Sequence, residues 1–228
     1  MKFVDIGSAK IDVDRVNRKG YSEVVYGSSK SAEQIEKIIN VLLDKKENAL
    51  VTRVNIEKYD YLRERIPGLS YDKESQVLTV GSSNPKLKFG LLYVVCAGTS
   101  DLAIAKEAVE VAKWMGINVK YLWDVGVAGL DRLLYYKEEL RKADVIVAVA
   151  GMEGSLPTVL SGLVDAPVIA VPTSIGYGAN LKGITTMLSM LTSCSSGITV
   201  TNIDNGFGAA YQAGLMIRRM NRMVMKND

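Results

Sequence analysis

Apolar residues in the second part of the chain form short unbroken runs, VIVAVA at residues 145–150 and VIAV at residues 168–171. Runs without alternation are typical of strands that are covered on both faces of a parallel sheet. Similar strands are predicted at residues 91–97, 117–123 and 198–203, and helical patterns follow at residues 130–143 and 207–225. Strands that alternate with helices through short turns predict an α/β fold with a doubly wound parallel sheet, in three layers as in Rossmann and flavodoxin folds.

The first part of the chain has a different pattern. Residues 1–29 show little periodicity and predict an extended, charged lead-in with one short strand near residues 23–27. Ser31 and Gln34 form a capping box before a helix that reaches Lys46. A strand at 49–54, a helix capped by Asn55 and a strand or hairpin at 69–80 follow. The GSSNP segment at residues 81–85 then predicts a boundary between a small α/β domain, 1–85, and the larger domain, 86–228.

Composition narrows the class of protein. Apolar residues make up 48% of the 228 residues and charged residues 23%, which is ordinary for a globular protein with a real core. The net charge of +3, without a Lys/Arg run, argues against nucleic-acid binding. No apolar stretch is long enough for a membrane span, and no signal segment follows Met1. With only two cysteines, we expect a cytoplasmic protein.

Histidine is absent from the sequence. Ser-His-Asp and Cys-His nucleophile systems are therefore excluded, as are histidine-based metal sites. Any general acid or base that works near neutral pH must be a carboxylate, Cys, Lys or Tyr in a suitable environment.

The turns that follow the predicted strands carry the candidate chemistry, because ligands of open α/β sheets bind at the carboxyl ends of the strands. The first is GTSD at residues 98–101, where a helix start favours an anion, although Ser100 or Asp101 is also a suitable helix cap. The second, GMEGSLP at residues 151–157, places Glu153 between two glycines. We favour a functional role for Glu153 over a solvated loop position. Thr173, Ser174 and Tyr177 belong to the third turn.

Cys194 lies in the polar segment TSCSSG at residues 192–197, an unusual setting for a residue that prefers the core. We expect the segment to bring this thiol near Glu153. A thiol at the end of a helix needs cationic help to act as a nucleophile, so a catalytic Cys194 is the less favoured interpretation from the residues alone. Cys96 ends an apolar strand and is expected to be inert.

Several motifs, in order along nearly the whole chain, resemble those of the LarB family. They are EVVYGSSKS (23–31), AGTSD (97–101), DVGVAGL (124–130), AGMEGSLP (150–157), PTSIGYG (172–178), MLTSCSSG (190–197) and NIDNGFGAA (202–210). LarB proteins are the pyridinium-3,5-biscarboxylic acid mononucleotide synthases of nickel-pincer cofactor biosynthesis. They are related to phosphoribosylaminoimidazole carboxylase, so the resemblance implies a PurE-like domain behind a small N-terminal domain.

The resemblance implies a carboxylase and hydrolase that acts on nicotinic acid adenine dinucleotide and CO2, in a homo-oligomer that is expected to be an octamer. No tightly bound cofactor is implied, although Mg²⁺ fits the hydrolysis of the phosphoanhydride, and the sequence does not specify a metal site. Cys194 matches the family's nucleophile and Glu153 its glutamate, our candidate base. The expected substrate-binding residues are Gly98, Thr99, Ser100, Asp101, Gly151, Gly154, Ser155, Ser174, Gly176, Tyr177, Gly178 and Lys30.

One position departs from the family pattern, because Asp131 stands where the family commonly has histidine. Two rival functions stay open. A carboxylase or mutase of purine synthesis shares the fold, but that family relies on histidine. A non-catalytic nucleotide-binding module would keep the glycine turns but has no use for a cysteine in a polar segment. The last helix carries Leu215, Met216, Met220 and Met223, an apolar excess that predicts a subunit interface.

Overall fold

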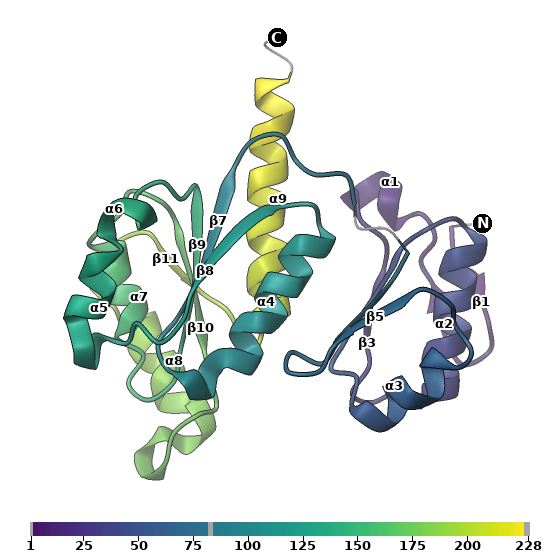
Figure 1. The fold of residues 1–228 in the computed structure, drawn as a ribbon, viewed down its shortest axis with the longest axis horizontal. Helices are drawn as coiled ribbons and strands as arrows, with labels where there is room; N and C mark the ends of the chain where they lie inside the picture. The colour runs from purple at the N-terminus through teal and green to yellow at the C-terminus, as the bar shows by residue number, and fades with distance from the viewer. Residues whose placement is uncertain (1, 82–83, 226–228) are drawn as a thin grey trace. The chain divides into compact units, whose positions relative to one another are not determined.

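A computed structural model describes residues 2–81 and 84–225, which fall into two compact units (Figure 1). The smaller unit is Met1–Pro85 and the larger one is Lys86–Asp228. Across the described residues, the structure contains no helix that is both long enough and apolar enough to cross a membrane.

The larger unit is built on one parallel sheet, which confirms the predicted fold class. Its strands are β7 (Leu91–Cys96), β8 (Asn118–Leu122), β9 (Val145–Ala150), β10 (Val168–Pro172) and β11 (Ile198–Val200). Their order is β11-β10-β9-β7-β8, and every neighbouring pair is parallel. This is the doubly wound order of flavodoxin-like folds, in which the chain changes direction between β7 and β9. A ligand site is expected at that switch point.

Helices cover both faces of this sheet (Figure 1). On one face lie α4 (Leu102–Trp114), after the short 3-10 turn η1 (Thr99–Asp101), and α9 (Gly206–Val224). On the other lie α5 (Leu130–Tyr135), α6 (Lys137–Leu140), α7 (Leu156–Ser161) and α8 (Ile184–Leu191), with the 3-10 turns η2 (Val127–Gly129) and η3 (Gly178–Gly183). Strands buried on both faces need apolar residues at every position, which explains the unbroken runs of β9 and β10.

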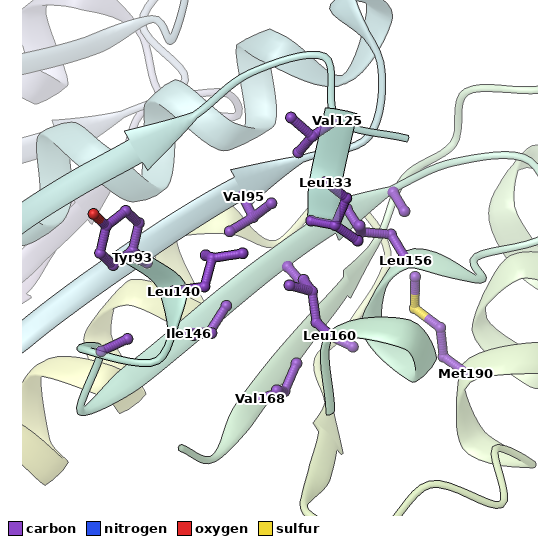
Figure 2. Close-up of a cluster of buried hydrophobic side chains, with 14 residues drawn as sticks. Tyr93, Val95, Val125, Leu133, Leu140, Ile146, Leu156, Leu160, Val168 and Met190 are labelled. Carbon is purple, nitrogen blue, oxygen red and sulfur yellow. The ribbon is translucent and has the colours of Figure 1, made fainter. Parts of the chain in front are cut away.

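The core on the α5–α8 face shows how the strands and helices interlock (Figure 2). Tyr93, Val95 and Ile146 from the sheet pack with Leu133, Leu140, Leu156, Leu160 and Met190 from the helices. These contacts fix α7 and α8 against the sheet, and with them the loops at the sheet's carboxyl edge.

Two sequence predictions in this unit were wrong. The helix expected over residues 130–143 divides into α5 and α6 at Tyr136, whose φ of −94° and ψ of 8° leave the helical region. Leu133 and Leu140 are buried as expected, but Leu134 is exposed because it follows Leu133 round the helix, away from the sheet.

The smaller unit is an α/β domain with more structure at its start than expected. Its sheet has the order β3-β4-β6-β5, in which only β3 and β4 are parallel. These strands are β3 (Val24–Tyr26), β4 (Ala49–Thr52), β5 (Leu69–Asp72) and β6 (Val77–Val80). The helices α2 (Ala32–Asp44), with the predicted capping box at Ser31, and α3 (Ile56–Arg63), capped by Asn55, accompany them. The expected extended lead-in is instead a hairpin, β1 (Val4–Asp5) and β2 (Lys10–Ile11), followed by α1 (Arg15–Lys19).

Candidate active site

A cavity of about 310 Å³ lies at the carboxyl edge of the parallel sheet. Gly98, Ser100 and Asp101 line it from the loop after β7, and Glu153 and Ser155 line it from the loop after β9. The cavity therefore straddles the switch point between these two strands, where the topology predicts a ligand. The loop after β8 and the start of α5 complete its walls with Asp124 and Arg132.

Asp101 ties the loops around the cavity together. Its carboxylate accepts hydrogen bonds from the Thr173 hydroxyl (2.6 Å) and from the Gly98 backbone N–H (3.2 Å), and also from the backbone of Gly151. The residue is only 4% exposed. Burial raises the pKa of Asp101, although these three hydrogen bonds oppose the rise. Asp101 thus holds the loops together and also lines the cavity, and its direct contact with substrate stays a prediction.

Gly151 occupies a place that no other residue fits. A Cβ built on it would lie 2.5 Å from the Ile175 carbonyl oxygen, 2.8 Å from Thr173 Oγ1 and 3.1 Å from Asp101 Oδ1. The first two distances are shorter than a carbon–oxygen contact allows, so the turns after β9 and β10 can approach each other this closely only with glycine here.

Glu153 reaches the cavity from a loop whose preceding residue, Met152, is held by two hydrogen bonds. The Met152 N–H donates to the Ile175 carbonyl oxygen (3.1 Å), and the Met152 carbonyl accepts from Asn180 (3.1 Å). Met152 and Gly154 on either side have φ values of 48° and 70°, so the backbone turns sharply around Glu153. The Ser155 hydroxyl donates to Glu153 Oε1 at 2.9 Å. Glu153 is exposed within the cavity and free to contact a ligand.

The turn after β10 contributes less to the cavity than expected. Ile175 lines the cavity, whereas Ser174, Gly176, Tyr177 and Gly178 are not among the described lining residues. Tyr177 is 81% exposed. The Ser174 N–H donates to Asp204 (2.7 Å) in the turn after β11, so Ser174 joins two turns through its backbone. Of the first turn, Thr99 is exposed and also outside the lining.

Arg132 is a cavity residue that the sequence reasoning did not select. Its Nη1 lies 2.7 Å from Asp124 Oδ2, and both side chains remain about half exposed. Arg132 follows Asp131 directly, and Asp131 is exposed and outside the described cavity lining. The cavity therefore has a cation one residue after the position where the family commonly has histidine, and this adjacency was the signal available in the sequence.

Cys194 does not share the Glu153 cavity within one chain. The thiol is exposed, in the turn that leads from α8 into β11. Ser193 Oγ lies 2.8 Å from Thr158 Oγ1, and the Ser161 hydroxyl donates to the Ser196 carbonyl (2.5 Å). These contacts place the turn beside α7, on the side of the sheet where β11 begins. Cys194 is not among the described residues that line the cavity, so the expected approach of this thiol to the Glu153 carboxylate stays a prediction.

Cys96 has the opposite environment. It is fully buried at the end of β7, and its thiol donates to the Gly98 carbonyl at 3.0 Å. Burial raises the pKa of Cys96 to about 12, so the thiol stays protonated at neutral pH.

Lys30 belongs to the smaller unit, directly before the N-cap of α2. Among the described residues of both units, no cluster of three or more Asp, Glu or Cys side chains is arranged to hold a metal ion.

Comparisons with known proteins match both units. Residues 3–82 match the LarB/PurE-like N-terminal domain model, and residues 91–227 match the AIR carboxylase model. The uncharacterized protein MJ0165 of Methanocaldococcus jannaschii is 41% identical over 221 residues, which cover 93% of this chain and 85% of that protein.

The larger unit alone is similar to N5-carboxyaminoimidazole ribonucleotide mutase of the same organism, at 36% identity over 54% of this chain and 76% of the mutase. A crystal structure of Treponema denticola PurE aligns with a TM-score of 0.44 and 15% identity, over 60% of this chain and 95% of that one. The AIR carboxylase model covers more than half of the chain, and the LarB/PurE-like N-terminal model covers the region before it. The chain therefore belongs to the AIR carboxylase family in its LarB form.

Proposed function

We propose that this protein carboxylates the pyridinium ring of nicotinic acid adenine dinucleotide at C5 and hydrolyses its phosphoanhydride. The products are pyridinium-3,5-biscarboxylic acid mononucleotide and AMP. The observation that carries the proposal is the LarB/PurE-like N-terminal domain joined to an AIR carboxylase domain in one chain. The similarity to the purine-pathway mutase of Methanocaldococcus jannaschii extends over only 54% of the chain, so it leaves the smaller domain without a counterpart.

The chemistry suits a chain without histidine. A pyridinium ring is electron-poor, so its C5 does not attack CO2 directly. Addition of the Cys194 thiolate at C4 converts the ring to a neutral dihydropyridine, whose C5 is an enamine carbon. C5 then forms a bond to CO2, and the nitrogen lone pair becomes an iminium. Glu153 removes the C5 proton, and the electron pair returns through the ring to expel the thiolate and restore the pyridinium.

A neighbouring subunit supplies the thiol in this proposal, because Cys194 lies outside the Glu153 cavity of its own chain. Ile184, Leu188 and Leu191 form a stripe at helical spacing along α8, and they are 41%, 53% and 59% exposed. Cys194 follows this stripe by one turn. Burial of the stripe against a second copy would bring Cys194 to that copy's surface. A closed symmetric assembly, an octamer by resemblance, then completes every site.

Hydrolysis of the phosphoanhydride uses different residues. Arg132 is the cation that lines the cavity, and a guanidinium is suited to a diphosphate because it can donate two parallel hydrogen bonds. Mg²⁺ commonly binds one or two carboxylates together with substrate phosphates. Asp124, beside Arg132, is the carboxylate that would hold such an ion, which would neutralise charge on the departing phosphate.

Mass spectrometry tests this function directly. The protein is incubated with nicotinic acid adenine dinucleotide and ¹³C-labelled bicarbonate, and we expect a labelled dicarboxylated mononucleotide together with AMP. Cys194→Ser should abolish the label, because a serine hydroxyl is far less nucleophilic, whereas Cys96→Ser serves as the matched control. Glu153→Gln should still form a thiol adduct, but its turnover should fall by about a hundredfold or more. Conversion of N5-carboxyaminoimidazole ribonucleotide, without any labelled pyridinium product, would favour the mutase instead.

A further inference from the structure

The cavity around Glu153 is small for the substrate proposed above. Its volume of about 310 Å³ is at the lower end of the range for drug-sized ligands. A dinucleotide consists of two mononucleotides, and the proposed chemistry at Glu153 assigns this cavity to the nicotinate half. If the proposed function holds, the adenosine half must lie on another part of the protein.

A second hollow, of about 610 Å³, lies along β8, the strand whose following loop lines this cavity. Its floor and walls come from Lys120 and Leu122 of β8, from Tyr93 of β7, and from Tyr135 and Glu139 at the end of α5 and in α6. We call it the β8 groove. Leu122 precedes Asp124 of the first cavity by two residues, and Tyr135 follows Arg132 by three, which is about one helical turn. The Arg132–Asp124 ion pair thus lines the first cavity and is close in sequence to residues of the β8 groove.

The chemistry of the β8 groove suits an adenosine. Tyr135 is 83% exposed, and its ring meets Tyr136 edge-on, with centroids 5.0 Å apart, so one face is free for a base. Glu139 accepts hydrogen bonds from the Tyr93 hydroxyl (2.7 Å) and from Lys120 (3.3 Å). These partners, the tyrosine first, hold the pKa of Glu139 down to about 2, so its carboxylate is ionised and able to accept ribose hydroxyls.

We propose that the β8 groove binds the adenosine half of the dinucleotide, that Tyr135 stacks on the adenine, and that Arg132 binds the diphosphate between the two hollows. The arrangement is compatible with the chain, because Lys120 lies in β8 and Asp124 follows the end of that strand by two residues. The inference rests on the proposed function, since it identifies where the second half of that substrate binds.

Calorimetric titration of the wild-type protein, Tyr135→Ala and Tyr135→Phe tests the inference. The probes are nicotinic acid adenine dinucleotide and nicotinic acid mononucleotide. Loss of one base-stacking ring typically weakens binding about tenfold. We therefore expect Tyr135→Ala to bind the dinucleotide about tenfold more weakly and the mononucleotide unchanged. Tyr135→Phe keeps the ring and should bind both as the wild type does.

The possible outcomes separate this inference from the function on which it rests. Equal dinucleotide affinity in the wild type and Tyr135→Ala would overturn the groove assignment and leave the proposed function intact. A change of oligomeric state in Tyr135→Ala, at unchanged affinity, would assign the groove to a subunit contact and also overturn the inference. Failure of the wild type to bind either ligand would overturn the proposed function and the inference together.

Discussion

Replacement of Gly151 by alanine should disrupt the junction that holds the candidate active site. The added Cβ would lie 2.5 Å from a backbone carbonyl oxygen, that of Ile175, which cannot turn aside as a side chain can. Thr173 Oγ1 and Asp101 Oδ1, at 2.8 and 3.1 Å, close the other directions. Overpacking of this kind costs about 1–3 kcal/mol. For a protein of this size, that loss lowers the melting temperature by roughly 2–12 °C.

The activity should fall further than the stability. Glu153 is two residues from Gly151, so a shift of the turn displaces the candidate base, and a misplacement of about 1 Å costs on the order of a hundredfold in rate. Gly162→Ala is the matched control. Gly162 has φ −79°, its nearest contact for a Cβ is 3.5 Å away, and alanine there should stabilise by about 0.4–1 kcal/mol. Chemical denaturation and labelled-bicarbonate turnover are measured for both. Equal behaviour of the two variants would refute the packing argument.

Three further predictions address the thiols, the buried carboxylate and the assembly. A maleimide at neutral pH should label Cys194 in the native protein at once and Cys96 only after unfolding, and mass spectrometry that finds both labelled equally fast would contradict the burial described here. The pKa of Asp101 is higher in the folded protein than its ordinary value of 3.8. The free energy of unfolding of the wild type should therefore fall as the pH rises from 3.8 through the pKa of the folded state. Asp101→Asn should lose that slope in denaturant titrations, and an unchanged slope would count against it. Met220→Lys puts a charge on the exposed side of α9 and should dissociate the assembly and reduce activity, whereas light scattering that shows an active monomer would exclude the interface.

The fold of the larger unit follows from local sequence patterns, because each strand is marked by an apolar run and each turn by glycine. The start of the chain was harder to predict, since two-residue strands such as Val4–Asp5 are too short to show a period. The division of the α5–α6 segment has a similar cause. Apolar residues on both sides of Tyr136 continue one pattern, and the break is visible only in the backbone angles.

The candidate site was predicted in part for a physical reason. Residues that follow β7 and β9 meet because parallel strands end at one edge, and Asp101 and Glu153 were placed by that rule. The same rule does not place Cys194, because this residue follows α8 and lies in the turn before β11. Arg132 was missed because its approach to the cavity depends on the angle of α5, which no sequence period encodes.

The position of β8 at the end of the five-stranded sheet has a consequence for solubility. An outer strand offers backbone groups that can pair with a strand of another molecule, which is a common start of aggregation. Lys120 stands in the middle of β8, and its ammonium is paired with Glu139. A strand from another molecule that paired with β8 would have to make room for the Lys120 ammonium or remove water from it. β11, at the opposite end, has three residues and offers a short template. The sheet can therefore keep two open edges and still resist growth into a fibril.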